Sequence, residues 1–175
     1  MIFAIRLEGV LEMKTLLVMR HAKSSWDDSG VADLERPLNT RGKRDAPRMG
    51  RLIREEEIVP DLIVASPARR TRLTAEAVAD QSGYEGEIEI NEDLYAADAE
   101  THLEVLRGLP DQHSCVLIVG HNPGLEELVE HLTDTWERLP TAALVQISLP
   151  LESWQDMQDD TEGKLIQAWR PRELP

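Results

Sequence analysis

The chain has 175 residues, 30% of them charged, and a formal net charge of −14. This length suits one domain with a sizeable buried core. The sequence has no run of about 18 apolar residues that would predict a membrane-spanning helix, and its acidity argues against nonspecific nucleic-acid binding. The single cysteine, Cys115, cannot form an internal disulfide; we expect a small core residue, which suits the reducing cytoplasm.

Charge is distributed unevenly along the chain. Residues 1–75 contain 14 Lys and Arg against 11 Asp and Glu, whereas residues 76–175 contain 5 against 22. The basic excess lies between Arg36 and Arg72. Two interpretations stay open: solvated helix faces, or a basic approach to an anionic site.

Residues 1–12 precede the first predicted strand. Arg6, Glu8 and Glu12 interrupt any apolar core, so this segment does not resemble a secretory signal. Met13 then opens the strand as a natural start would. We expect the domain to span residues 13–175 and residues 1–12 to be an N-terminal extension.

The first predicted strand, residues 16–19, runs directly into Arg20 and His21. A short apolar run of this kind is typical of a strand buried on both faces. The carboxyl ends of such strands are where open α/β sheets bind ligands. Arginine is a permanent cation with planar donors suited to phosphate, and histidine can act as nucleophile, acid or base. A surface Arg-His pair is the alternative interpretation.

A polar loop and a helix follow this strand. Lys23 and Ser24 are close enough in sequence to reach a bound phosphate, although an ordinary loop is equally compatible. The helix is expected to begin with Asn39 or Thr40 as its N-cap. Pro47 lies inside the helical pattern and should kink the helix or move its start later.

Two further buried strands repeat the first layout. Residues 62–65 lead into Ser66-Pro67 and Arg70, and residues 115–119 lead into His121-Asn122-Pro123. Ser66 and Asn122 are each followed by proline, which predicts an N-cap and a helix start. If the three strands are parallel neighbours, Arg20, His21, Arg70 and His121 converge at one edge of the sheet.

The remaining elements alternate between strand and helix. His102 and His113 lie in polar surroundings and are expected at the surface, and His131 is expected to be structural or exposed. This alternation predicts a single three-layer α/β domain with a largely parallel sheet. The predicted elements are strand 87–90, helix 99–109, a helix through residue 132, strand 143–149, a short helix over 151–157 and a last, edge strand over 165–169.

The three post-strand motifs together resemble the histidine phosphatase superfamily, whose fold is phosphoglycerate mutase-like. The motifs are Arg20-His21, then Ser66-Pro67-x-x-Arg70-x-x-x-Thr74-Ala75, then Gly120-His121-Asn122-Pro123. The longer strings 20–26 and 119–124 are most similar to the small phosphohistidine phosphatases of the SixA type. Ala22 stands where most of the superfamily has glycine, a departure common in the SixA-like branch.

The resemblance implies the roles of the four converging residues. In the family the first histidine is phosphorylated and water then releases phosphate, so His21 would be the nucleophile. Arg20, Arg70 and His121 would complete the phosphate pocket, with Lys23, Ser24 and Asn122 as candidate substrate-binding residues. Direct attack by water, with His21 as base, is the mechanistic alternative. A metal is not expected, because a two-histidine site lacks a third ligand and two arginines would repel a cation; no cofactor is implied.

The leaving group decides the substrate class. An alkoxide needs a general acid, and the available carboxylates are Glu92, Asp93, Asp98 and Glu100, none in a motif of that role. The SixA type lacks this acid, and imidazole is a far easier leaving group. Three hypotheses therefore stand: a phosphatase of phosphohistidine on a phosphorelay or phosphotransfer protein, a phosphatase of small phosphomonoesters, and a noncatalytic phosphate-binding module. The sequence does not predict the oligomeric state.

Overall fold

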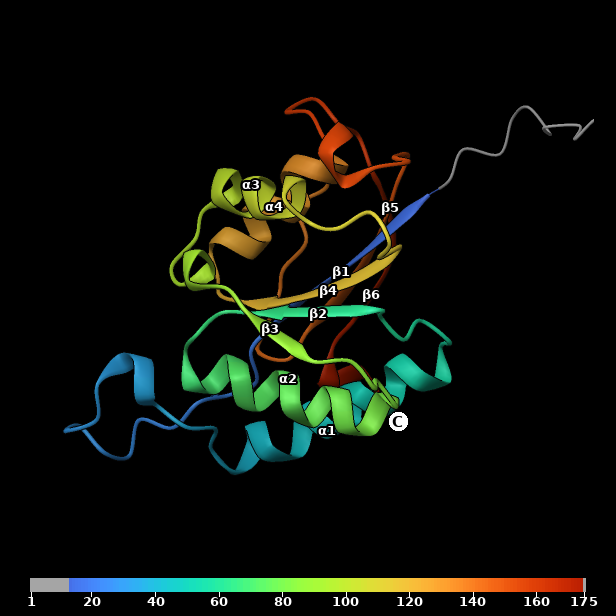
Figure 1. Ribbon diagram of the computed structural model, residues 1–175. Helices are drawn as coiled ribbons and strands as arrows, with labels where there is room; N and C mark the ends of the chain where they lie inside the picture. Colours follow the sequence, from blue (N-terminus) through green and yellow to red (C-terminus); the bar gives the residue numbers. More distant parts are fainter. Residues whose placement is uncertain (1–12, 175) are drawn as a thin grey trace, which may run out of the picture.

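The computed structural model describes residues 13–174, so the prediction for residues 1–12 lies outside it. The chain forms a single α/β domain around one six-stranded sheet in the order β3-β2-β4-β1-β5-β6 (Figure 1). β1 to β4 are mutually parallel, β5 is antiparallel to β1, and β6 is antiparallel to β5. The predicted, largely parallel sheet is confirmed. The strands are β1 Lys14–Arg20, β2 Leu62–Ala65, β3 Ile88–Ile90, β4 Cys115–Gly120, β5 Leu144–Leu149 and β6 Lys164–Trp169.

Helices cover both faces of the sheet, which confirms three layers. Figure 1 shows α1 (Thr40–Glu55) and α2 (Arg69–Ser82) on one face, and α3 (Ala99–Arg107) and α4 (Gly124–Thr133) on the other. Successive β1 side chains point to opposite faces. Leu16 and Val18 therefore join the core beneath α3 and α4, while Leu17 and Met19 join the core beneath α1 and α2. Among the described residues, no helix has the length and apolarity to cross a membrane.

The helix starts agree with prediction at α1 and differ at α2 and α4. Asn39 caps α1 by accepting a hydrogen bond from the Gly42 N–H at 2.9 Å. Pro47 lies inside this helix, so the start is not moved later. Ser66 does not cap α2, which begins at Arg69; its hydroxyl pairs with a histidine ring and accepts from the Ala68 N–H at 3.4 Å. Asn122 does not cap α4, because its amide donates to the Leu139 carbonyl instead.

Three other predictions need correction. Residues 151–157 contain a single 3-10 turn, Trp154–Asp156, instead of a short α-helix. His102 is fully buried, because it lies on the inner side of α3 and its Nδ1 donates to the Asp98 carbonyl at 2.6 Å. Cys115 is only half-buried against the core, where burial raises the pKa of its thiol to about 12. β6 is an edge strand as predicted.

Candidate active site

The carboxyl ends of β1, β2 and β4 bring the predicted residues together. His21 follows β1 and His121 follows β4, and their ring centroids lie 5.3 Å apart. Arg70, in the first turn of α2, places its Nη2 3.4 Å from the His121 Nδ1. Their exposed fractions are only 8%, 8% and 5% for His21, His121 and Arg70. Arg20 ends β1, and its charge adds to the desolvation that lowers the pKa of both histidines. We call Arg20, His21, Arg70 and His121 the phosphate pocket.

The His21 ring is held in one orientation. Its Nδ1 lies 2.8 Å from the Ala22 carbonyl oxygen, which can only accept, so Nδ1 carries the proton. Desolvation lowers the pKa of His21 to about 3; the hydrogen bond to Ala22 opposes this shift, and the nearby His121, Arg70 and Arg20 reinforce it. The ring is therefore neutral at neutral pH, with the lone pair on Nε2. A neutral imidazole with this tautomer can attack phosphorus.

His121 is held between a hydroxyl and a cation. Its Nε2 lies 2.7 Å from the Ser66 Oγ, and its Nδ1 faces the Arg70 guanidinium. Because a guanidinium only donates, Nδ1 accepts and Nε2 carries the proton. Desolvation, followed by the charge of Arg70, lowers the pKa of His121 to about 4. The second histidine is therefore also neutral at neutral pH.

An acidic residue that the sequence analysis did not single out contacts Arg70. Arg70 Nη1 donates to the Asp33 carbonyl at 2.7 Å, and Nη2 pairs with the Asp33 Oδ2 at 3.1 Å. Tyr95 Oη donates to the same carboxylate oxygen at 2.8 Å, and Arg36 Nε donates to the other at 3.0 Å. Desolvation would raise the pKa of Asp33, but these hydrogen bonds and the Arg70 charge lower it to about 2. The only sequence signal was the three-residue spacing between Asp33 and Arg36.

Motif residues fix the loop that follows His21. The Ala22 N–H donates to the Thr74 Oγ1 at 3.0 Å, and that hydroxyl donates to the Arg70 carbonyl at 2.7 Å. Gly42 packs against the Lys23 backbone, where a Cβ would lie 2.2 Å from the Lys23 carbonyl oxygen. The loop, α1 and α2 are therefore locked together beside the histidines.

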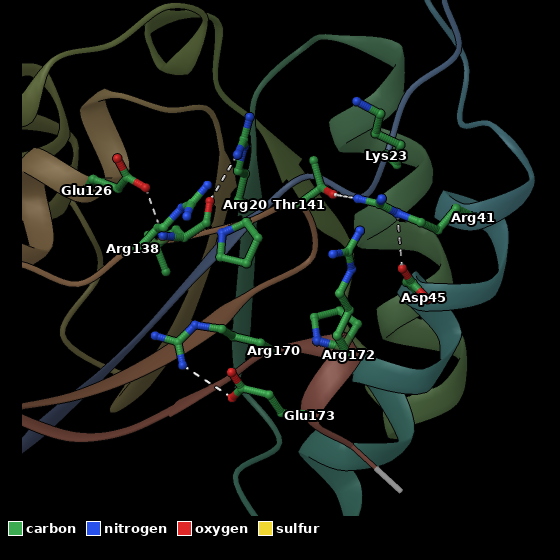
Figure 2. A pocket seen from close by; sticks show the side chains of 13 residues that line it. Arg20, Lys23, Arg41, Asp45, Glu126, Arg138, Thr141, Arg170, Arg172 and Glu173 are labelled. Carbon is green, nitrogen blue, oxygen red and sulfur yellow. Dashed lines mark hydrogen bonds and ion pairs between the residues drawn. The ribbon is translucent and has the colours of Figure 1, made fainter.

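The three candidate substrate-binding residues occupy different positions. Ser24 is buried and its Oγ accepts from Arg36 Nη1 at 2.7 Å. Asn122 donates to the Leu139 carbonyl at 2.9 Å, and the same oxygen accepts from Arg20 Nη1 at 3.0 Å. Lys23 lines a cleft beside Arg20 (Figure 2). Substrate binding by these residues stays a prediction.

Within the described chain, the four candidate acids form no hydrogen bond or ion pair with the phosphate-pocket side chains. Asp98 accepts from the Thr101 N–H as the N-cap of α3, and Glu100 pairs with Arg107. Glu92 and Asp93 are exposed in a 3-10 turn. The aromatic ring of Tyr95 instead lies edge-on to His121, with centroids 5.8 Å apart. Tyr95 and Asp33 therefore flank the pocket at the place where a general acid would act.

Comparison with known proteins decides the family. A model of the histidine phosphatase superfamily (branch 1) matches residues 16–113. The chain belongs to the histidine phosphatase superfamily. An uncharacterised chloroplastic protein of Arabidopsis thaliana is 31% identical over 155 residues, which are 82% of this chain and 70% of that protein. An uncharacterised Mycobacterium tuberculosis protein is 36% identical over 105 residues, and the match spans 60% of this chain but only 63% of that relative.

A solved structure of another histidine phosphatase extends the comparison to the whole fold. A Nakamurella multipartitia protein assigned as the phosphohistidine phosphatase SixA superposes with a TM-score of 0.80 at 26% identity. The match covers 91% of this chain and 96% of that one. The resemblance to the SixA type is thus confirmed, and the domain has the fold of phosphatases and mutases that act through a histidine.

Proposed function

We propose that the protein is a phosphatase that forms a phosphohistidine intermediate on His21. The observation that carries this proposal is the His21 ring itself. Its Nδ1 hydrogen bond to the Ala22 carbonyl and its lowered pKa leave a lone pair on Nε2, beside Arg70 and His121. A binding pocket needs donors for phosphate but has no need of a nucleophile, which disfavours a noncatalytic module.

The reaction has two steps. In the first, Nε2 of His21 attacks phosphorus in line; the P–N bond forms as the bond to the leaving group breaks, and the leaving group keeps that electron pair. Arg20 and Arg70 hold the nonbridging oxygens, over which negative charge is spread. His121 donates a hydrogen bond to one of these oxygens once its ring is protonated, because in the neutral ring Nδ1 accepts from Arg70 and the Nε2–H faces the Ser66 hydroxyl. In the second step water attacks phosphorus, inorganic phosphate leaves, and neutral His21 returns.

Asp33 competes with the substrate for Arg70. A phosphoryl group that takes the Nη1 and Nη2 donors displaces the Asp33 carbonyl and carboxylate, which those donors bind at 2.7 and 3.1 Å, whereas the buried Nε has no partner within residues 13–174. The carboxylate keeps two further partners, Tyr95 and Arg36, which can hold the 3-10 turn Asp33–Glu35 near the pocket mouth. Substrate binding through these two nitrogens therefore exchanges one anion for another.

We further propose phosphohistidine on a phosphorelay or phosphotransfer protein as the substrate. Within residues 13–174 the four candidate acids form no hydrogen bond or ion pair with the pocket side chains, and the carboxylate that is near, Asp33, has a pKa of about 2 and stays ionised at neutral pH. An ionised carboxylate cannot protonate an alkoxide, whereas imidazole leaves without strong acid assistance. The likeness to a protein assigned as SixA supports the same substrate. A small phosphomonoester is the alternative, and a cytoplasmic signalling role accompanies the first proposal.

The test is phosphate release from a phosphohistidine-bearing protein and from an aryl phosphate. We expect fast release from phosphohistidine by the wild type, none by His21→Ala, and full activity of His131→Ala, which changes an exposed histidine. Acid-quench trapping should locate radiolabelled phosphate on His21 during turnover. Better turnover of the aryl ester would favour a small-molecule substrate. Phosphate binding without any turnover would leave only the binding module.

A further inference from the structure

A cleft of about 550 Å³ adjoins the phosphate pocket, and its lining contains more basic than acidic residues (Figure 2). Its lining includes three acidic side chains, Asp45, Glu126 and Glu173. The two histidines and Arg70 lie outside it, and Arg20 belongs to both regions. We call this region the basic cleft. Its six basic residues are Arg20, Lys23, Arg41, Arg138, Arg170 and Arg172.

Three of these six cationic side chains have no hydrogen-bond or ion-pair partner within the described residues. Arg170 pairs with Glu137 and Glu173, and Arg41 donates to the Thr141 Oγ1 at 2.8 Å and faces Asp45. The Lys23, Arg138 and Arg172 side chains have no hydrogen-bond or ion-pair partner within residues 13–174. A chain with 33 acidic residues could have neutralised them. Free cations around a concavity are suited to an external anion.

The distribution of charge along the chain supports the same conclusion. Residues 76–175 contain only five Lys and Arg, and three of these, Arg138, Arg170 and Arg172, line the cleft. They come from the α4–β5 connection and the segment after β6, and face Lys23 and Arg41 from the first quarter of the chain. The fold therefore gathers scarce cations from distant segments at one place. A chain with a net charge of −14 repels anionic substrates, so the cleft is the favourable approach for them.

Arg20 connects the cleft to the phosphate pocket. Its Nη1 is bound to the Leu139 carbonyl, while its buried Nε has no partner in the described chain. The Leu139 carbonyl is also held by Asn122, which precedes α4, and the Leu139 N–H donates to Glu126 at 2.8 Å. The cleft wall and the pocket thus share one hydrogen-bonded segment. A ligand with one anionic group in the cleft can therefore place another group beside the phosphate pocket.

We propose that the basic cleft is an anion subsite that binds a second carboxylate or phosphate group of the substrate. This rests on the proposed function, since the first anionic group is the phosphoryl group attacked by His21. The volume of the cleft is in the range of small-ligand sites, so it can admit one such group with its attached atoms. The second group comes either from an acidic side chain beside the phosphorylated residue of a protein or from a small molecule with two phosphates.

Calorimetric binding of nonhydrolysable ligands tests this without turnover. One pair is a peptide carrying a phosphonate analogue of phosphohistidine with flanking glutamates, and the same peptide with glutamines. The other pair is an alkyl bisphosphonate and the matching monophosphonate. We expect the two-anion ligand of at least one pair to bind about tenfold or more tightly than its partner at low salt. The pair that shows the preference identifies the source of the second anion.

Charge-removal variants assign that preference to the cleft. Arg138→Gln/Arg172→Gln should lose it, whereas Arg54→Gln/Lys164→Gln should keep it, because both residues are exposed outside the cleft. Equal binding within both pairs by the wild type, or equal loss in the two double variants, would overturn the subsite. A cleft-dependent preference in a protein that releases no phosphate would keep the subsite and reject the phosphatase.

Discussion

The phosphate pocket and the basic cleft share Arg20, yet they differ in how their charges are held. In the pocket, His21, Arg70 and His121 are nearly inaccessible and each is bound by neighbouring groups. In the cleft, Arg138 and Arg172 are exposed and have no side-chain partner within residues 13–174. Fixed donors in a buried site stabilise charge that develops in a transition state. Exposed cations instead attract and orient anions of varied shape.

The largest expected difference comes from the same conservative change in each region. Arg70→Lys retains the charge but loses the planar fork that holds Asp33 and, by proposal, two phosphate oxygens. We expect kcat/KM to fall by about 10²- to 10³-fold. Arg172→Lys in the cleft should change it by less than about threefold. Steady-state kinetics on an aryl phosphate measures kcat/KM of both variants. Equal losses would show that the pocket and the cleft do not differ in how strictly they need the planar guanidinium.

The second prediction concerns pH, and it separates the pocket from the cleft. Burial lowers the pKa of His21 to about 3 and of His121 to about 4, from an ordinary value of 6.5. Between these values the unfolded chain binds protons that the folded chain does not, so the free energy of unfolding falls as pH is lowered from about 6.5 toward 4. Replacing both rings, in His21→Asn/His121→Asn, should remove much of this loss.

Urea denaturation at neutral pH and at about pH 4.5 measures how the free energy of unfolding depends on pH. We expect the wild type to lose more stability on acidification than the double variant, by a few kcal/mol. His131→Asn is the matched control, because that histidine is exposed. The Arg138→Gln/Arg172→Gln variant should also follow the wild type. An unchanged slope in the double histidine variant would mean that the two rings titrate normally.

The contrast between the regions also explains what the sequence could predict. His21 and His121 directly follow apolar strands, and Arg70 lies in the first turn of the helix after β2, so the strand pattern and parallel pairing were enough to bring these three residues together. Asp33 escaped notice because a loop carboxylate has no periodic signal, and its contact with Arg70 depends on how residues 22–36 fold back. The cleft cations come from segments about 150 residues apart in sequence, from Lys23 to Arg172. Only the tertiary fold shows that they are neighbours.

Buried polar side chains account for the other errors. His102 was expected at the surface because its sequence neighbours are polar, yet it faces inward beside Leu103 and Leu106 and satisfies its Nδ1 through the Asp98 carbonyl. Ser66 has the sequence context of a helix cap, but its hydroxyl pairs with His121. Sequence context predicts local capping well where no distant group competes for the side chain, as at Asn39.

The third prediction tests the competition at Arg70. Asp33→Asn keeps the size of the side chain but removes the charge that pairs with Arg70 Nη2. We expect the dissociation constant for inorganic phosphate to fall by about three- to tenfold, because the anion no longer displaces another anion. Glu35→Gln removes the same charge from the same 3-10 turn without contacting Arg70 and should have little effect. Weaker phosphate binding by Asp33→Asn would mean that the carboxylate positions Arg70 for the ligand.

The smallest expected effect lies at the boundary between the regions. Asn39 caps α1 through the Gly42 N–H, and its own N–H donates to the Lys23 carbonyl at 2.9 Å, so it connects the helix to the loop between pocket and cleft. Asn39→Ala removes the cap but keeps the backbone bond, and should cost about 1 kcal/mol of unfolding free energy. Asn39→Asp retains an acceptor and should stay near wild type. Because the backbone bond and the Gly42 contact remain, kcat should change little; a large loss of kcat with unchanged stability would instead make this cap a positioning element for His21.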